Sequence, residues 1–79
     1  MVETRVAPRY RVAKPAKIEF GSEKISCTIL DLSVTGAALL LSDSLPIPAT
    51  FTLVIPEDGL RLTCNVAWRR EFRMGVAFE

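Results

Sequence analysis

Short apolar segments recur along the whole chain, and clusters of Gly, Pro, Asp and Ser separate them. Their polar and apolar residues alternate, which is typical of antiparallel strands with one face in a core. In residues 60–68, Arg61, Thr63, Asn65 and Ala67 alternate with Leu60, Leu62, Cys64, Val66 and Trp68. The predicted strands cover residues 16–20, 25–30, 36–41, 50–55, 60–68 and 73–78. Six short strands predict an all-β fold, a small six-stranded antiparallel β-barrel, because closure removes exposed strand edges.

The length of 79 residues predicts one domain, residues 1–79. We expect the barrel to occupy residues 14–79 and residues 1–13 to form a flexible N-terminal arm, with no substantial helix after the last strand. No apolar run approaches the ~18 residues of a membrane span, and the first residues lack the apolar stretch of a signal peptide. A cytoplasmic location without membrane insertion is therefore expected.

Positive charge is concentrated at the N-terminal end of the chain. Residues 1–19 carry five basic and two acidic side chains, a net +3, whereas residues 20–79 carry five basic and seven acidic side chains, a net −2. This distribution favours a local anion-binding site over the broad basic face of a protein that binds nucleic acid. We therefore expect no nucleic-acid partner.

The chain contains no histidine and two cysteines, Cys27 and Cys64. Without histidine, no Ser-His, Cys-His or two-His metal site can be assembled from these residues. We expect a protein that is not an enzyme and that holds no metal and no cofactor. Both cysteines lie in strand-like segments, which predicts small buried core residues; a disulfide between neighbouring strands is the alternative.

Two arginines four residues apart, Arg5 and Arg9, frame the segment RVAPR. A guanidinium fork can grip a phosphate with two hydrogen bonds and can stack on a base. The pair therefore fits a ligand that carries phosphate and purine groups. An ordinary solvated basic terminus is the alternative.

The segment DLSVTG, residues 31–36, interrupts two apolar runs. Asp31 and Ser33 lie two residues apart and would share a face of an extended chain. A carboxylate can accept hydrogen bonds from the N–H edge of a guanine, and a hydroxyl can donate to a phosphate. Gly36 would supply a positive φ or room for a close approach. A turn held by Asp or Ser side chains is the alternative.

Together, Arg-x-x-x-Arg and Asp-x-Ser-x-x-Gly around six strands resemble the PilZ domain family. PRYRVAKPAKIEF resembles that family's first strand, and NVAW followed by MGVAFE resembles its last two. The resemblance implies a non-catalytic receptor for the bacterial second messenger cyclic di-GMP. It also implies that Arg5 and Arg9 clasp the phosphates and stack on guanine, that Asp31 and Ser33 hydrogen-bond the ligand, and that Gly36 lets it approach. Its signal would be the ordering of the arm, sensed by a downstream protein partner.

Trp68 is a further candidate for the ligand site. Alternation places it on the apolar face of its strand, which predicts a residue of the core or of the barrel rim; the alternative is an aromatic wall beside the ligand. Arg69, Arg70 and Arg73 follow it. They predict a solvated basic turn, with contact to a ligand or a partner as the alternative.

Other functions stay open at this point. The same fold could act as a protein-interaction module that binds no nucleotide, through the arm and the segment SLPIPA, residues 44–49. A barrel for single-stranded nucleic acid is less well supported, because such sites need a basic groove lined with aromatic side chains.

Overall fold

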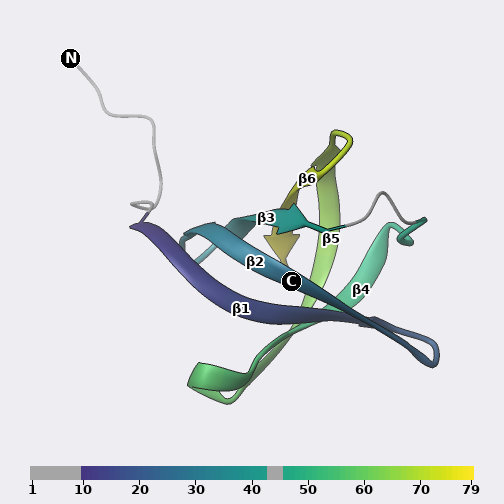
Figure 1. Cartoon of the computed structure of the whole chain (residues 1–79), viewed down its shortest axis with the longest axis horizontal. Helices are drawn as coiled ribbons and strands as arrows, with labels where there is room; N and C mark the ends of the chain where they lie inside the picture. Colours follow the sequence, from purple (N-terminus) through teal and green to yellow (C-terminus); the bar gives the residue numbers. More distant parts are fainter. Residues whose placement is uncertain (1–9, 43–45) are drawn as a thin grey trace.

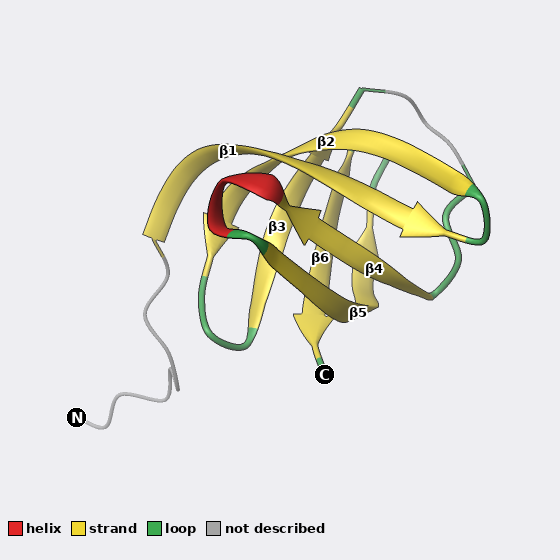
Figure 2. Ribbon diagram, turned by 90° about the horizontal axis from the view of Figure 1, so that it is seen from below, coloured by secondary structure: helices red, strands yellow, loops and turns green. Residues whose placement is uncertain are grey.

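Six antiparallel strands close into a barrel (Figures 1 and 2). The computed structural model of the chain describes residues 10–42 and 46–79. The elements are β1 (Tyr10–Phe20), β2 (Glu23–Leu32), β3 (Gly36–Leu41), β4 (Thr50–Ile55), the short 3₁₀ helix η1 (Pro56–Asp58), β5 (Leu60–Arg69) and β6 (Arg73–Phe78). Around the barrel the order is β1-β2-β3-β6-β5-β4, and pairing of β1 with β4 closes it. The predicted fold class is confirmed.

The first strand is longer than the sequence predicts. It begins at Tyr10, whereas we expected a strand over residues 16–20 after an arm that ended at residue 13. Tyr10 pairs with Leu32 and Arg11 pairs with Asp31, so residues 10–13 belong to the barrel wall. The assignment of these four residues to the arm was wrong; the rest of the expected arm, residues 1–9, lies outside the described residues.

Pro15 explains why the start of this strand was misplaced. A proline cannot donate a backbone hydrogen bond, so it argues against a central strand and is accepted along an edge. Pro15 pairs with Thr28 of β2 on one side. On the other side, β1 pairs with β4 only over Lys17–Glu19. The first part of β1 therefore has a single strand neighbour, and a proline is tolerated there.

The core of the barrel consists of the inward-facing residues of all six strands. Seven side chains are essentially inaccessible to solvent: Ile18, Ile29, Leu39, Leu53, Ile55, Cys64 and Met74. Burial of each large aliphatic side chain contributes about 1.5–3 kcal/mol to stability. Among the described residues no polar or charged side chain is buried. The core therefore stabilises the fold, and any polar contact with a ligand must come from the outer face.

Both cysteines lie in this core as free thiols. Removal from water raises the pKa of the Cys27 thiol to about 12, and the neighbouring Cys64 adds to this effect. Burial likewise raises the pKa of Cys64 to about 11. The prediction of small buried core residues is confirmed, and the disulfide alternative is wrong.

Candidate functional site

The hydroxyl of Ser33 holds the turn between β2 and β3. Its oxygen accepts hydrogen bonds from the backbone N–H groups of Thr35 and Gly36, both at 3.2 Å. The backbone N–H of Ser33 donates to the carbonyl of Gly36 at 2.9 Å. This is a turn closed by a serine side chain. The turn alternative is thus confirmed for Ser33, and its contact with a ligand stays a prediction.

Gly36 begins β3 where that strand comes very close to β6. Its φ is not positive, because the positive-φ glycines in the described part of the chain are Gly21 and Gly59. A β-carbon at position 36 would overlap the carbonyl oxygen of Val76 on β6. The sequence suggested two reasons for a glycine at position 36. The prediction of a positive φ is wrong, and the prediction of a close approach is confirmed. The approaching group is a strand of the barrel itself.

Asp31 lies within β2, not in the loop that follows it. The next residue, Leu32, packs against the core, so alternation points Asp31 to the outer face. Asp31 pairs with Arg11 on β1 and with Ala38 on β3. The carboxylate therefore stands on the outer wall of the barrel, beside an arginine of the neighbouring strand.

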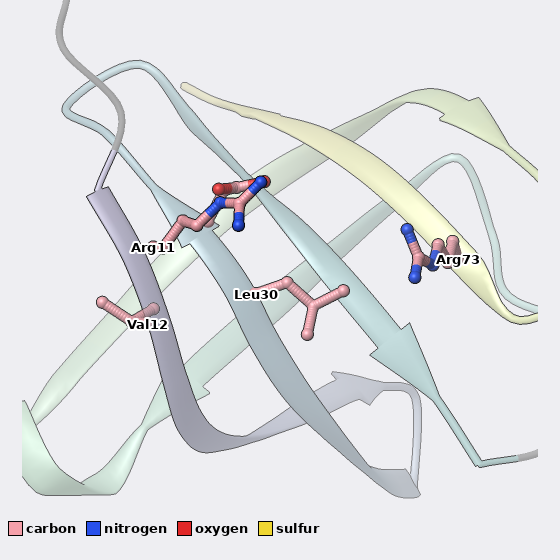
Figure 3. A pocket seen from close by; sticks show the side chains of 5 residues that line it. Arg11, Val12, Leu30 and Arg73 are labelled. Atoms are coloured by element: carbon pink, nitrogen blue, oxygen red, sulfur yellow. The ribbon is translucent and has the colours of Figure 1, made fainter.

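A surface pocket of about 330 Å³ surrounds this position. The described residues that line it are Arg11, Val12, Leu30, Asp31 and Arg73. Figure 3 shows Arg11 and Arg73 on opposite sides of it, with Leu30 of β2 between them. The lining thus combines two apolar side chains with two guanidinium groups and a carboxylate. Such a surface can bind a flat anionic molecule through its faces and its edges.

Two irregularities in strand pairing shape this pocket. The register of β1 against β2 shifts between Arg11 and Lys14. The register of β2 against β3 shifts between Ile29 and Asp31, which leaves Leu30 as the extra residue of a bulge. A bulge bends the strand and redirects side chains. Leu30 follows the buried Ile29 and faces outward by ordinary alternation, and the bulge then turns Asp31 outward as well, so both residues line the pocket.

Trp68 is on the outer face of the barrel, and its predicted place on the apolar face of β5 was wrong. Val66 pairs with Val76, but Trp68 pairs with Gly75, so β5 has one extra residue here. This shift reverses the alternation and turns the indole outward, where 44% of Trp68 is exposed. A β-carbon at position 75 would overlap the indole ring. The ring therefore lies on the bare backbone of β6.

A second surface pocket of about 330 Å³ lies beside the indole. Trp68, Arg69, Arg70 and Arg73 line it. The predicted basic turn is only partly right, because Arg69 ends β5 and Arg73 begins β6. Arg73 borders both this pocket and the one around Asp31.

The two arginines of the first motif, Arg5 and Arg9, lie outside the described residues. The first described residue is Tyr10, which pairs with Leu32 at the end of β2. The described part of the chain therefore begins beside the Asp31 pocket. The structure brings Asp31, Ser33 and Gly36 together at one end of β2 and β3.

Sequence reasoning missed Arg11, Val12 and Leu30 as pocket residues. In the sequence, Arg11 is one of several basic residues of the N-terminal end, and Leu30 is the last residue of a predicted strand. A sequence does not reveal the two bulges that redirect this part of the wall. The signal that was present is the concentration of basic residues before residue 20.

Two further findings concern the part of the chain that the structure describes. Within residues 10–42 and 46–79, no three Cys, Asp or Glu side chains gather in a way that could hold a metal ion. No helix in those ranges has the length and apolar character needed to span a membrane. The features that do stand out are guanidinium groups around apolar and aromatic surface.

Comparison with known proteins connects this barrel to one family. No curated protein matches the chain. Among protein-family models, the PilZ domain matches residues 3–79. The match includes both polar motifs and all six strands. PilZ domains are generally modules that bind cyclic di-GMP. The chain belongs to the PilZ domain family.

Proposed function

We propose that this protein is a non-catalytic receptor for cyclic di-GMP, and that the ligand binds on the outer wall of the barrel beside Asp31. The family match over residues 3–79 carries the proposal. The pocket around Asp31 supports it, because it offers cationic, anionic and apolar groups on one surface. Cyclic di-GMP has matching groups: two phosphodiester charges and two guanines.

Each motif residue has a role in this proposal. Arg5 and Arg9 contact the phosphates and stack on a guanine, as guanidinium forks can do both. Asp31 accepts hydrogen bonds from the N1–H and N2–H₂ edge of a guanine. Ser33 holds the turn between β2 and β3, and Gly36 lets β3 lie close to β6; Ser33 also hydrogen-bonds the ligand. Trp68 lies beside it.

The signal in this proposal is ordering of the N-terminal segment over the ligand. Because β1 begins at Tyr10, the segment that closes is residues 1–9, shorter than the arm expected from sequence. Closure of Arg5 and Arg9 over a bound anion changes the surface that a downstream protein meets. The output is then an altered contact with that partner in the bacterial cytoplasm.

Isothermal titration with cyclic di-GMP tests the proposal, with GTP and cyclic GMP as controls. We expect saturable binding of cyclic di-GMP alone. Arg9→Ala and Asp31→Asn should each weaken it at least about tenfold, since loss of a charge-assisted hydrogen bond costs roughly 1.5–3 kcal/mol. Arg61→Ala and Asp58→Asn serve as matched controls outside the pockets. Their partners, Glu19 and Lys14, form exposed ion pairs that contribute little to stability.

A folded protein that gives no heat with cyclic di-GMP would contradict the proposal. That result would favour a PilZ-fold module that acts only through protein contacts. Wild-type affinity in both Arg9→Ala and Asp31→Asn would overturn the assignment of these residues, even if the ligand binds.

A further inference from the structure

Arg73 projects from the outer face of the barrel wall at the start of β6. Its neighbour along the strand, Met74, is fully buried, so alternation points Arg73 outward. Across the sheet it pairs with Leu40, which is itself exposed. In the described part of the chain, no residue forms a hydrogen bond or an ion pair with its guanidinium. The charge is thus available to a ligand.

Arg73 lies between two surface pockets that no sequence motif connects. One lies around Asp31 and Arg11, and the other lies around Trp68. Arg73 is the described residue that lines both of them. Figure 3 shows its guanidinium facing the same pocket as Arg11. The two pockets therefore meet at one cation.

Only a short stretch of sheet with a small side chain separates Asp31 from the indole. Asp31 pairs with Ala38, and Ala38 pairs with Gly75, on which the indole lies. Two strand spacings of ~4.8 Å separate the strand of Asp31 from the strand under the indole. On this row, the residue between the carboxylate and the indole is an alanine. A flat ligand resting against Asp31 can thus reach the indole.

We propose that the binding site continues across β3 and β6 to Trp68, and that Arg73 is the cation that joins its two halves. The ligand class is a purine dinucleotide, whose two bases and two phosphates can occupy both pockets around a single guanidinium. This inference rests on the proposed function and extends it to residues outside both sequence motifs. Arg73 donates to a phosphate or to a guanine oxygen, and the indole face covers a base.

Titration of Arg73→Ala with cyclic di-GMP tests the inference. We expect affinity to fall on the order of tenfold, because charge-assisted hydrogen bonds are lost. Arg73→Lys should lie between this variant and the wild type, since lysine keeps the charge without the planar fork. Arg61→Ala removes the same group near the start of β5, at the other end of that strand from Trp68 and outside both pockets. This variant should bind normally. Thermal unfolding of each variant confirms that the fold is retained.

The single tryptophan supplies a second readout. Emission from Trp68 should change as cyclic di-GMP is added, and the change should saturate at the affinity measured by calorimetry. In Arg73→Ala the emission change should move to higher ligand concentration by the same factor as the heat.

The outcomes separate the two proposals. If wild-type protein binds cyclic di-GMP and Arg73→Ala binds as tightly as Arg61→Ala, the extension across β6 is wrong and the receptor proposal stands. Calorimetric binding without any change in Trp68 emission would also overturn the extension. If the folded wild-type protein binds no cyclic di-GMP, both proposals fail.

Discussion

The indole ring of Trp68 lies on the backbone of Gly75, so close that a β-carbon at position 75 would overlap Nε1 and Cε2. The contact crosses from β5 to β6 at the bulge that turns Trp68 outward. One face of the ring is thereby covered by the barrel wall, and 44% of the residue stays exposed. The absence of a side chain at position 75 is what allows an aromatic ring to lie flat here.

We expect Gly75→Ala to displace the indole and to lower the free energy of unfolding by about 1–3 kcal/mol, the usual cost of an added methyl group without space. Tryptophan emission and urea unfolding measure the two effects. In a Trp68→Ala background the same substitution should cost much less, because the obstructing ring is gone. An equal cost in both backgrounds would show that the ring is not the obstacle.

Gly36→Ala should be more damaging than Gly75→Ala, because here the obstacle is the backbone. A β-carbon at position 36 would overlap the carbonyl oxygen of Val76. A backbone carbonyl within a paired strand cannot move away, whereas an exposed side chain can change its rotamer. We expect a loss of about 3 kcal/mol or more in urea unfolding, near the upper end for overpacked sites. Ala38→Gly on the same strand is the control and should cost under about 1 kcal/mol. A Gly36→Ala protein as stable as Gly75→Ala would contradict this order.

Ser33→Ala should destabilise the barrel even without a ligand. The hydroxyl accepts two backbone hydrogen bonds that close the turn between β2 and β3, and each such bond contributes about 0.5–1.5 kcal/mol net. We expect a loss of about 1 kcal/mol by urea unfolding. Ser26→Ala, at an exposed position in the middle of β2, should stay within about 0.5 kcal/mol of wild type. If Ser33→Ala matches that control, the turn does not depend on the hydroxyl.

The strands and the core could be predicted from the sequence because alternation and turn residues are local signals. Residues 36–41, 50–55 and 73–78 form strands with the predicted limits. Cys27 and Cys64 are buried, as their strand-like surroundings indicated. In each case the prediction needed only the identity of neighbouring residues.

The outer wall could not be predicted in the same way, because it depends on pairing register. One extra residue in β5 reverses the facing of Trp68, and no residue type in that segment marks the shift. Another extra residue, Leu30 in β2, turns Asp31 outward into the pocket. Arg11 and Arg73 face one pocket only because β1 and β6 are both close to β2 and β3 in the closed barrel. Motifs indicated Asp31 but not the residues around it.

The two core thiols should make the barrel sensitive to alkaline pH. The pKa values of Cys27 and Cys64 are raised from 9.0 to about 12 and about 11 in the folded state. Below pH 9 both thiols are protonated in the folded and unfolded chains, and their contribution to stability is fully present. Above pH 9 the unfolded chain loses these protons first, so the free energy of unfolding falls by about 1.4 kcal/mol per pH unit for each thiol. The loss ends as pH passes the raised values.

Urea unfolding between pH 7 and pH 11 measures this dependence, and Cys64→Ala supplies the comparison. The variant should be less stable at pH 7, because the removed sulfur leaves space in the core. Its stability should then fall less steeply above pH 9, since one of the two titrating thiols is gone. The remaining alkaline slope reports Cys27, together with the exposed ion pair in which a hydrogen bond to Asp58 raises the pKa of Lys14. Parallel curves for wild type and Cys64→Ala above pH 9 would show that this thiol is not kept protonated by burial.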